Sequence, residues 1–280
     1  MGHRFGDRLR ALRPLVGIRH ALVLSFWTAL SWSPPSASCQ EPEVTPDDVK
    51  KFLDPTMLIN SLDYSFDAIA LPGDVDSYNH TVMPVWALSS WTAVWAEIPY
   101  RRVSIADGND LSGIGDIALE WGVMIHEDLE RRFTSSVASL EVQAPTGSYE
   151  DGTGLGRWVL APTGALALNP TDLFPIYVEG QYNHSVGGDA GEPVRALELT
   201  VTSVQILPKG FYVSVTPMFF FDFHENMRGF SLSVAVGAAL TRNFAWAVGY
   251  ARHVAGTKRF DQGLSLSLGF IWGEEKTRDR

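Results

Sequence analysis

Several features that would identify common protein classes are scarce in this 280-residue sequence. It has a single cysteine, Cys39, which excludes an internal disulfide framework and any zinc site built from clustered cysteines. Charged residues make up only 19% of the chain and aromatic residues 11%, a balance that excludes a disordered chain. No Gly-X-Y period or sustained heptad occurs, so collagen and coiled-coil folds are excluded as well.

Long apolar runs and positive charge are also lacking in the body of the chain. Beyond the N-terminal region, no segment approaches the roughly 18 apolar residues of a membrane-spanning helix. Residues 1–40 hold five arginines and one aspartate, so the remaining residues hold 17 bases and 31 acids, a net charge of −14. Nucleic-acid binding depends on Lys and Arg at the phosphates, so we exclude nucleic acid as a partner.

Residues 1–39 are predicted to be a secretory signal peptide. A basic stretch up to His20 precedes the apolar run 21–32, and small, helix-breaking residues follow at 33–38. The apolar run is shorter than the ~20 residues of a spanning helix, so we expect cleavage near 37–40 rather than a retained anchor. A lipid on Cys39 is an alternative, although the usual leucine of a lipoprotein site is missing at Ser36.

The exported body alternates between two kinds of side chain with a period of two, which is typical of β-strands. From Leu264 to Trp272, bulky apolar residues occupy one face, and Ser265, Ser267 and Gly269 lie on the other. Segments 230–240 and 244–254 repeat the pattern. Nine tilted residues cover about 23 Å, close to the ~25 Å apolar band of an outer-membrane barrel.

The pattern predicts twelve strands, whose connections alternate between long, Gly- or Asp-rich loops and tight turns. The strands are expected at 58–70, 78–88, 93–103, 116–126, 132–143, 157–168, 174–184, 195–206, 211–222, 230–240, 244–254 and 264–272. The long loops are expected at 72–74, 106–110, 147–156, 187–191, 224–229 and 255–263, and the turns at 89–92, 127–131, 169–173, 207–210 and 242–243. The fold class is therefore all-β, a transmembrane antiparallel up-and-down β-barrel with both chain ends on the short-turn side.

Charge placement gives an independent test, because Lys or Arg on the lipid face costs about 2–4 kcal/mol near the bilayer midplane. The predicted outward faces carry only Arg102, Arg132, Arg195 and Arg252, each at a strand end. Ten charged residues are predicted to face the lumen and to select the solute: Asp63, Asp67, Glu97, Arg101, Glu120, Glu141, Arg157, Glu179, Glu198 and Asp222. Eight of them are acidic, which favours cations in a water-filled lumen; in a packed lumen the carboxylates would pair or take up protons, and the two cases stay open.

Four prolines fall inside predicted strands, at Pro84, Pro99, Pro162 and Pro217. A closed barrel has no free edge where a missing N–H is harmless. We therefore expect bulges or register shifts at these positions, or shorter strands.

The predicted organisation is a signal peptide at 1–39, a short periplasmic segment at 40–57, the barrel at 58–273 and a polar tail at 274–280. Thr45 is a good N-cap and Pro46 a good first helical residue, and Pro55 ends the pattern, so a short helix is expected at about 45–53. This helix either docks in the periplasmic mouth as a plug or trails outside it, and we expect it to trail.

Several motifs resemble, in their order, the outer-membrane "MetA-pathway of phenol degradation" transporter-like family. They are Ser112-Gly113-Ile114-Gly115-Asp116, Pro145-Thr146-Gly147, Gly154-Leu155-Gly156-Arg157-Trp158 and Leu207-Pro208-Lys209-Gly210-Phe211-Tyr212. The resemblance covers about 110–272, and residues 41–57 match no motif of the family. It implies an outer-membrane barrel that moves small, often hydrophobic compounds, and it implies no catalytic residues.

Three features of the sequence could indicate phosphate binding, metal binding or catalysis. The glycine-rich segment 152–156 precedes a predicted strand rather than the helix that a phosphate loop needs, so we interpret it as a mobile loop. His126-Glu127 and His224-Glu225 place an imidazole beside a carboxylate, but neighbours on a strand point to opposite faces. A barrel hydrolase would need a set gathered at the rim, with His184, Ser185, Asp222, His224 and His253 as candidates.

These observations predict a passive channel or uptake protein for small, hydrophobic or aromatic molecules in the outer membrane of a Gram-negative cell. We expect no cofactor, no metal and no catalytic residues. The expected partners are outer-membrane lipid, a small-molecule solute and, through the C-terminal strand, the barrel-assembly machinery. Two alternatives stay open: a lipid-modifying or hydrolytic barrel enzyme, and a soluble secreted β-barrel that binds an apolar ligand.

Overall fold

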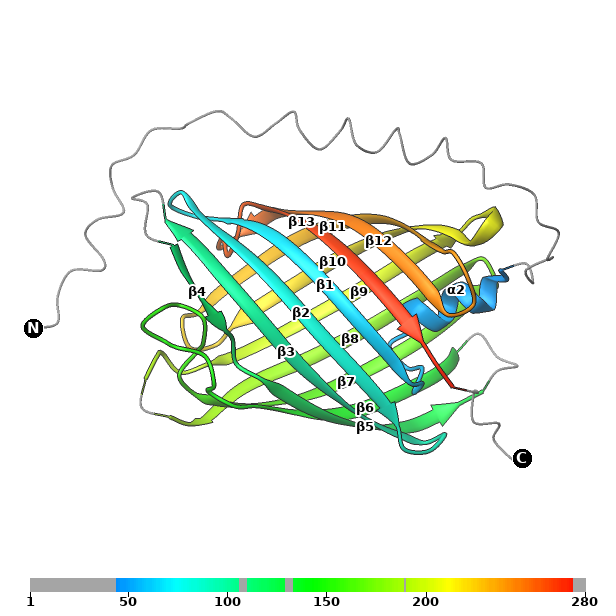
Figure 1. Ribbon diagram of the computed structural model, residues 1–280, viewed down its shortest axis with the longest axis horizontal. Helices are drawn as coiled ribbons and strands as arrows, with labels where there is room; N and C mark the ends of the chain where they lie inside the picture. The colour runs from blue at the N-terminus through cyan, green and yellow to red at the C-terminus, as the bar shows by residue number, and fades with distance from the viewer. Residues whose placement is uncertain (1–43, 106–109, 129–132, 189, 274–280) are drawn as a thin grey trace, which may run out of the picture. The chain divides into compact units, whose positions relative to one another are not determined.

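The chain folds into a closed antiparallel β-barrel (Figure 1). A computed structural model describes residues 44–105, 110–128, 133–188 and 190–273. The described strands are β1 (Ser61–Leu71), β2 (Val75–Ala87), β3 (Thr92–Ile105), β4 (Asp110–Ile114), β5 (Ala118–Glu127), β6 (Phe133–Gln143), β7 (Trp158–Thr171), β8 (Phe174–Gly187), β9 (Arg195–Ile206), β10 (Phe211–Asp222), β11 (Met227–Ala239), β12 (Phe244–Gly256) and β13 (Gln262–Ile271). All but β4 form the barrel, which closes where β1 pairs with β13. The predicted fold class and the count of twelve barrel strands are confirmed.

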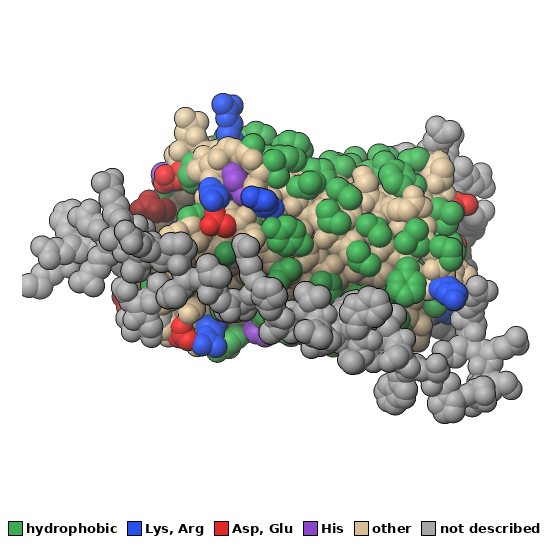
Figure 2. Space-filling view, turned by 90° about the horizontal axis from the view of Figure 1, so that it is seen from above, with side chains coloured by type: hydrophobic (Ala, Val, Ile, Leu, Met, Phe, Trp, Pro, Cys, Tyr) green, Lys and Arg blue, Asp and Glu red, His purple; other side chains and the backbone are tan. Residues whose placement is uncertain are grey.

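The alternating sequence explains why these strands form a barrel with an apolar outside. Val234 and Phe270 are 43% and 47% exposed, although a soluble protein would bury such residues. Figure 2 shows hydrophobic side chains over the middle of the barrel wall, with charged side chains toward its two ends. This surface suits lipid, whereas the facing sheets of a soluble sandwich would have covered it. No helix among the described residues has the length and apolar character needed to cross a membrane.

The loops differ from the predicted alternation of long and short connections. β1 and β2 are joined by residues 72–74 alone, where Gly73 and Asp74 have φ values of 88° and 56°. β10 and β11 are joined by only four residues, 223–226. The prediction was wrong here because the strands continue pairing beyond the apolar segments that identified them. The additional strand β4 likewise extends the β3 hairpin, pairing Asp110 with Ser104.

Three of the four prolines, Pro84, Pro162 and Pro217, do not create the predicted bulges. Near Pro84 the β2–β3 ladder is interrupted, near Pro162 the β7–β8 ladder, and near Pro217 the β9–β10 ladder. The register is the same on both sides of each interruption. Pro99 pairs with Thr81, and its carbonyl accepts a hydrogen bond from Gly115. On its other side β3 changes partner from β4 to β5 at Pro99 and the register shifts by one residue, as predicted. At Pro84, Pro162 and Pro217 the proline removes one donor without adding a residue, so the pleat continues and only the local hydrogen bond is lost.

The predicted short helix is present as α2 (Pro46–Leu53), and it does not trail outside the barrel. Thr45 caps it, with Asp48 completing a reciprocal capping box. Val49 is fully buried in a cluster with side chains from the inner wall, including Tyr177, Val204 and Tyr212. Figure 1 shows α2 at the end of the barrel that carries the short turns. The expectation of a trailing segment was wrong because the barrel interior buries the apolar face of α2.

The predicted signal peptide at 1–39, with Cys39, and the predicted tail at 274–280 lie outside the described residues. Arg132, one of the predicted outward arginines, also lies outside them. Arg102, Arg195 and Arg252 are exposed and sit near strand ends, as predicted.

Candidate functional site

The barrel interior holds two cavities, of about 430 and 450 Å³. Both are lined by Phe52 of α2, together with Asp63, Met83 and Glu97 of the barrel wall. The first extends along the segment that follows α2, and the second runs along the inner faces of β12 and β13. α2 therefore divides the space available to a solute at the short-turn end.

Six of the ten predicted lumen residues line these cavities. Asp63, Glu97, Glu120, Glu141 and Glu179 border the first cavity, and Asp63, Asp67 and Glu97 border the second. All six come from β1, β3, β5, β6 and β8. The inner face contributed by β11–β13 instead carries small residues such as Ser233, Gly249 and Ser267. The lumen thus has one acidic wall and one uncharged wall.

Glu120 of the acidic wall is held by two side-chain hydrogen bonds. It accepts a hydrogen bond from Trp95 Nε1 at 2.7 Å and a short one from Ser139 Oγ. Glu141 lies directly opposite Glu120 on the neighbouring strand. Two carboxylates in this register repel each other when both are charged, and a cation between or beside them would relieve that repulsion.

The other four predicted residues bind parts of the protein itself. Arg101 donates from Nε to Asn79 at 3.1 Å, and Arg157 donates from Nε to the Gly191 carbonyl at 2.9 Å. Asp222 accepts the backbone N–H groups of the turn that follows it. Glu198 accepts from Arg259 at 2.7 Å. None of the four borders either cavity, and each has a hydrogen-bond partner within the protein.

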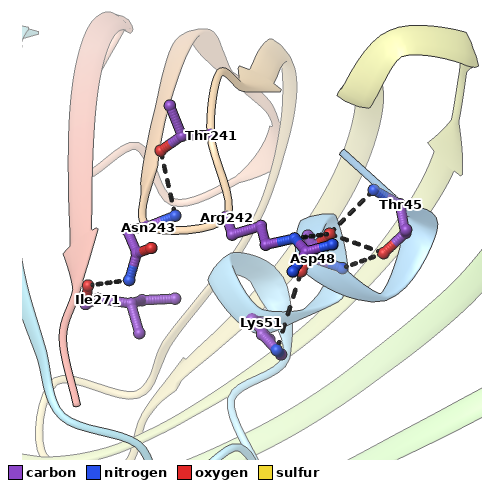
Figure 3. Close-up of polar contacts among 7 residues, drawn as sticks. All are labelled: Thr45, Asp48, Lys51, Thr241, Arg242, Asn243 and Ile271. Carbon is purple, nitrogen blue, oxygen red and sulfur yellow. Dashed lines mark hydrogen bonds and ion pairs between the residues drawn. The ribbon is translucent and has the colours of Figure 1, made fainter. Parts of the chain in front are cut away.

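Contacts with the short turns hold α2 in the mouth (Figure 3). Asp48 bonds with Thr45, and it lies 3.8 Å from Lys51 and 3.9 Å from Arg242 of the β11–β12 turn. Asn243 of the same turn donates to the Ile271 carbonyl of β13 at 2.7 Å. The turn that binds α2 is thereby fixed to the last strand.

The segment after α2 is fastened as well. Asp54 accepts two hydrogen bonds from Thr56, whose hydroxyl makes a short contact with Ser135 Oγ of β6. Burial raises the pKa of Asp54, and the hydrogen bonds from Thr56 oppose that shift in part. Thr56 is almost completely buried, so this link ties the segment to the inner wall.

At the opposite end of the barrel, a hydrogen-bonded cluster around Asp116 joins three of the motifs that carried the family resemblance. The buried Asp116 accepts the backbone N–H of Gly147 at 2.9 Å and of Leu155 at 2.6 Å. Thr146 Oγ1 donates to the Gly115 carbonyl and accepts from the Ile117 N–H. A Cβ on Gly147 would lie 2.8 Å from Gly154, so neither position has room for a side chain. The motifs therefore fold the outer loop 144–157 over the break between β4 and β5, a role that sequence reasoning missed.

The candidate rim histidines do not assemble into a hydrolytic set. His224 Nε2 lies 3.8 Å from Glu192, and His253 Nε2 contacts the Gly256 carbonyl at 3.2 Å. Ser185 Oγ accepts from the Val194 N–H, and His184 stacks on Tyr182. Within the described ranges, no hydrogen bond joins the side chains of two of the five candidates, and no group of three His, Cys, Asp or Glu side chains has a geometry suited to a metal ion.

The barrel is similar in fold to solved outer-membrane channels and porins. No protein-family model matches the sequence, and no curated protein is significantly similar to it. Among solved structures, the COG4313 outer membrane channel from Pseudomonas putida matches with a TM-score of 0.65 and 14% identity over 82% of this chain and 100% of that chain. The chain has the fold of an outer-membrane channel. The KdgM porin matches with a TM-score of 0.53 and 9% identity, covering 76% of this chain and 99% of that chain. The NanC porin gives 0.51 and 9%, covering 77% and 100%.

Proposed function

We propose that the protein is a passive outer-membrane channel for small solutes and that its lumen favours cations over anions. The observation that carries this proposal is the closed barrel whose interior holds cavities bordered by six carboxylates. An apolar outer wall and a polar interior are what a barrel needs to span lipid and pass a hydrated solute. The fold shared with channels and porins supports the same proposal.

The acidic wall supplies the selectivity. Carboxylates in a narrow, partly desolvated pore attract cations and repel anions, because these charges are screened less than charges in bulk water. The uncharged wall opposite leaves room for the apolar part of a solute. Small hydrophobic or aromatic compounds are the solutes proposed on that account, because the resemblance to the phenol-degradation family implies a barrel that moves small, often hydrophobic compounds.

The test is the ion current of the full chain in planar lipid bilayers. In a potassium chloride gradient, we expect a reversal potential of the sign that indicates cation preference. The double variant Glu120→Gln/Glu141→Gln should lower that preference while the barrel still folds, which a gel of boiled and unboiled samples checks. Glu150→Gln, in an exposed outer loop, is the matched control and should behave as the wild type.

Two outcomes would overturn the proposal. Absence of any current from a correctly folded barrel would contradict the channel, and anion preference in the wild type would contradict the assigned role of the carboxylates. Hydrolysis of a lipid or ester that is lost on changing His224 or His253 would instead favour the barrel enzyme. Outer-membrane location and assembly through the C-terminal strand belong to the same proposal, and membrane fractionation tests the location.

A further inference from the structure

Arg259 reaches from a loop to the inner wall of the barrel. It lies between β12 and β13, and its Nη1 donates to Glu198 Oε1 of β9 at 2.7 Å. Its guanidinium carbon stands 3.9 Å from the centre of the Phe220 ring on β10. The three side chains therefore form one cluster, although 61 residues separate Arg259 from Glu198.

The β9–β10 ladder holds the backbone of both wall residues independently of Arg259. Glu198 and Phe220 are direct cross-strand partners in the β9–β10 ladder. Phe220 is only 7% exposed, and the Glu198 side chain is 27% exposed. A carboxylate beside an aromatic face is the combination that recognises a flat or alkylated cation, because one supplies charge and the other a negative π-surface.

Arg259, which fills this site, belongs to the loop between β12 and β13. The loop is tied down at its two ends, where Thr257 donates to the Arg228 carbonyl and Asp261 donates to the Ala70 carbonyl, both at 2.7 Å. Arg259 lies between these ties, and its side chain is 51% exposed. Solvent can therefore reach the guanidinium, and a second cation can compete for the same acid and ring.

We propose that Glu198 and Phe220 form a binding site for organic cations of the guanidinium or alkylammonium class, with Arg259 as its resident occupant. A soluble cation that replaces Arg259 frees the loop from the wall at the long-loop end of the barrel. The site stands on its own geometry; it refines the proposed channel by naming a solute class, but binding does not require conduction.

The experiment measures binding of methylguanidinium to the full chain in detergent by saturation-transfer difference NMR. N-methylurea, which has nearly the same shape without the charge, is the matched ligand control. The wild type should bind methylguanidinium weakly, because a tethered guanidinium competes at high effective concentration. Arg259→Ala should bind it at least about fivefold more tightly, since the competitor is gone.

Variants in the Arg259→Ala background identify the site. Glu198→Gln should weaken binding about tenfold, as expected for loss of a charge-assisted hydrogen bond. Phe220→Leu should weaken it roughly two- to fivefold, the range of a cation–π contact. Two variants are the controls. Lys258→Ala in the wild type changes the neighbouring loop position, which pairs with Asp261 of the same loop. Glu225→Gln changes an exposed acid of the β10–β11 turn.

The proposal fails if Arg259→Ala binds no more tightly than the wild type, or if Glu198→Gln leaves the affinity of Arg259→Ala unchanged. Saturable binding of N-methylurea would also overturn it. Current in bilayers without methylguanidinium binding would retire this site and leave the channel standing. Binding without any current would do the reverse.

Discussion

At the scale of single residues, the charged side chains divide into those that face open space and those that hold the protein together. Glu97, Glu120, Glu141 and Glu179 border a cavity, whereas Arg157 is hydrogen-bonded to an outer loop. Alternation placed both groups on the inner face but could not separate them. Partners come from loops distant in sequence, so only the folded chain distinguishes a solute contact from an internal one.

Asp116 provides the sharpest residue-scale prediction. Asp116→Ala leaves two backbone N–H groups of loop 144–157 without their acceptor, so we expect the free energy of unfolding to fall by about 2–3 kcal/mol. The measurement is urea unfolding followed by the gel shift between boiled and unboiled protein. Asp151→Ala removes an exposed acid from the same loop and should change little. Equal stability of the two variants would show that the hydrogen bonds of Asp116 do not stabilise the barrel.

At the scale of elements, α2 occupies part of the barrel interior at the short-turn end. Val49 is fully buried among inner-wall residues, and Phe52 borders both cavities. An eight-residue helix is marginal by itself in water, so its helical state depends on this docking. Formation of the helix and its docking in the barrel are therefore expected to occur together.

Val49→Asp tests this dependence. An unpaired carboxylate at a fully buried position costs on the order of several kcal/mol, more than the docking of so short a helix is expected to supply. We expect α2 to leave the mouth and the single-channel conductance to rise, with the barrel still folded by the gel assay. Asp47→Ala, an exposed residue of the same helix, should conduct as the wild type. Unchanged conductance in Val49→Asp would show that α2 does not limit the current.

At the scale of the whole molecule, the direction of the apolar face separates a membrane barrel from a soluble one. Val234 lies on the outside of β11, and Leu240 lies just beyond the end of that strand, on the same side. Val234→Arg should destabilise the lipid-embedded barrel by about 2–4 kcal/mol, and Leu240→Arg by at most about 1 kcal/mol. Unfolding of each variant from lipid vesicles measures the difference. In a soluble barrel both substitutions would be nearly neutral, so equal and small effects would contradict the membrane assignment.

The pH dependence of selectivity is also a property of the whole lumen. Carboxylates lose their negative charge as the pH falls. We expect the cation preference to be stronger at about pH 8 than at about pH 4, because a carboxylate that has taken up a proton no longer attracts cations. Reversal potentials measured across this range check it. A preference that is the same at both pH values would show that the acidic wall does not set the selectivity.

The sequence by itself determined the strand periodicity, the twelve barrel strands, the outward apolar face and the start of α2. These features depend on local rules: period-two alternation, strand length matched to a bilayer, and a helix cap of Thr45 followed by Pro46. The tertiary structure alone decided that α2 docks inside, that Asp116 joins two outer segments, and that Arg259 reaches Glu198. Each depends on which residues barrel closure brings face to face across many intervening residues, and neither spacing nor composition encodes that proximity.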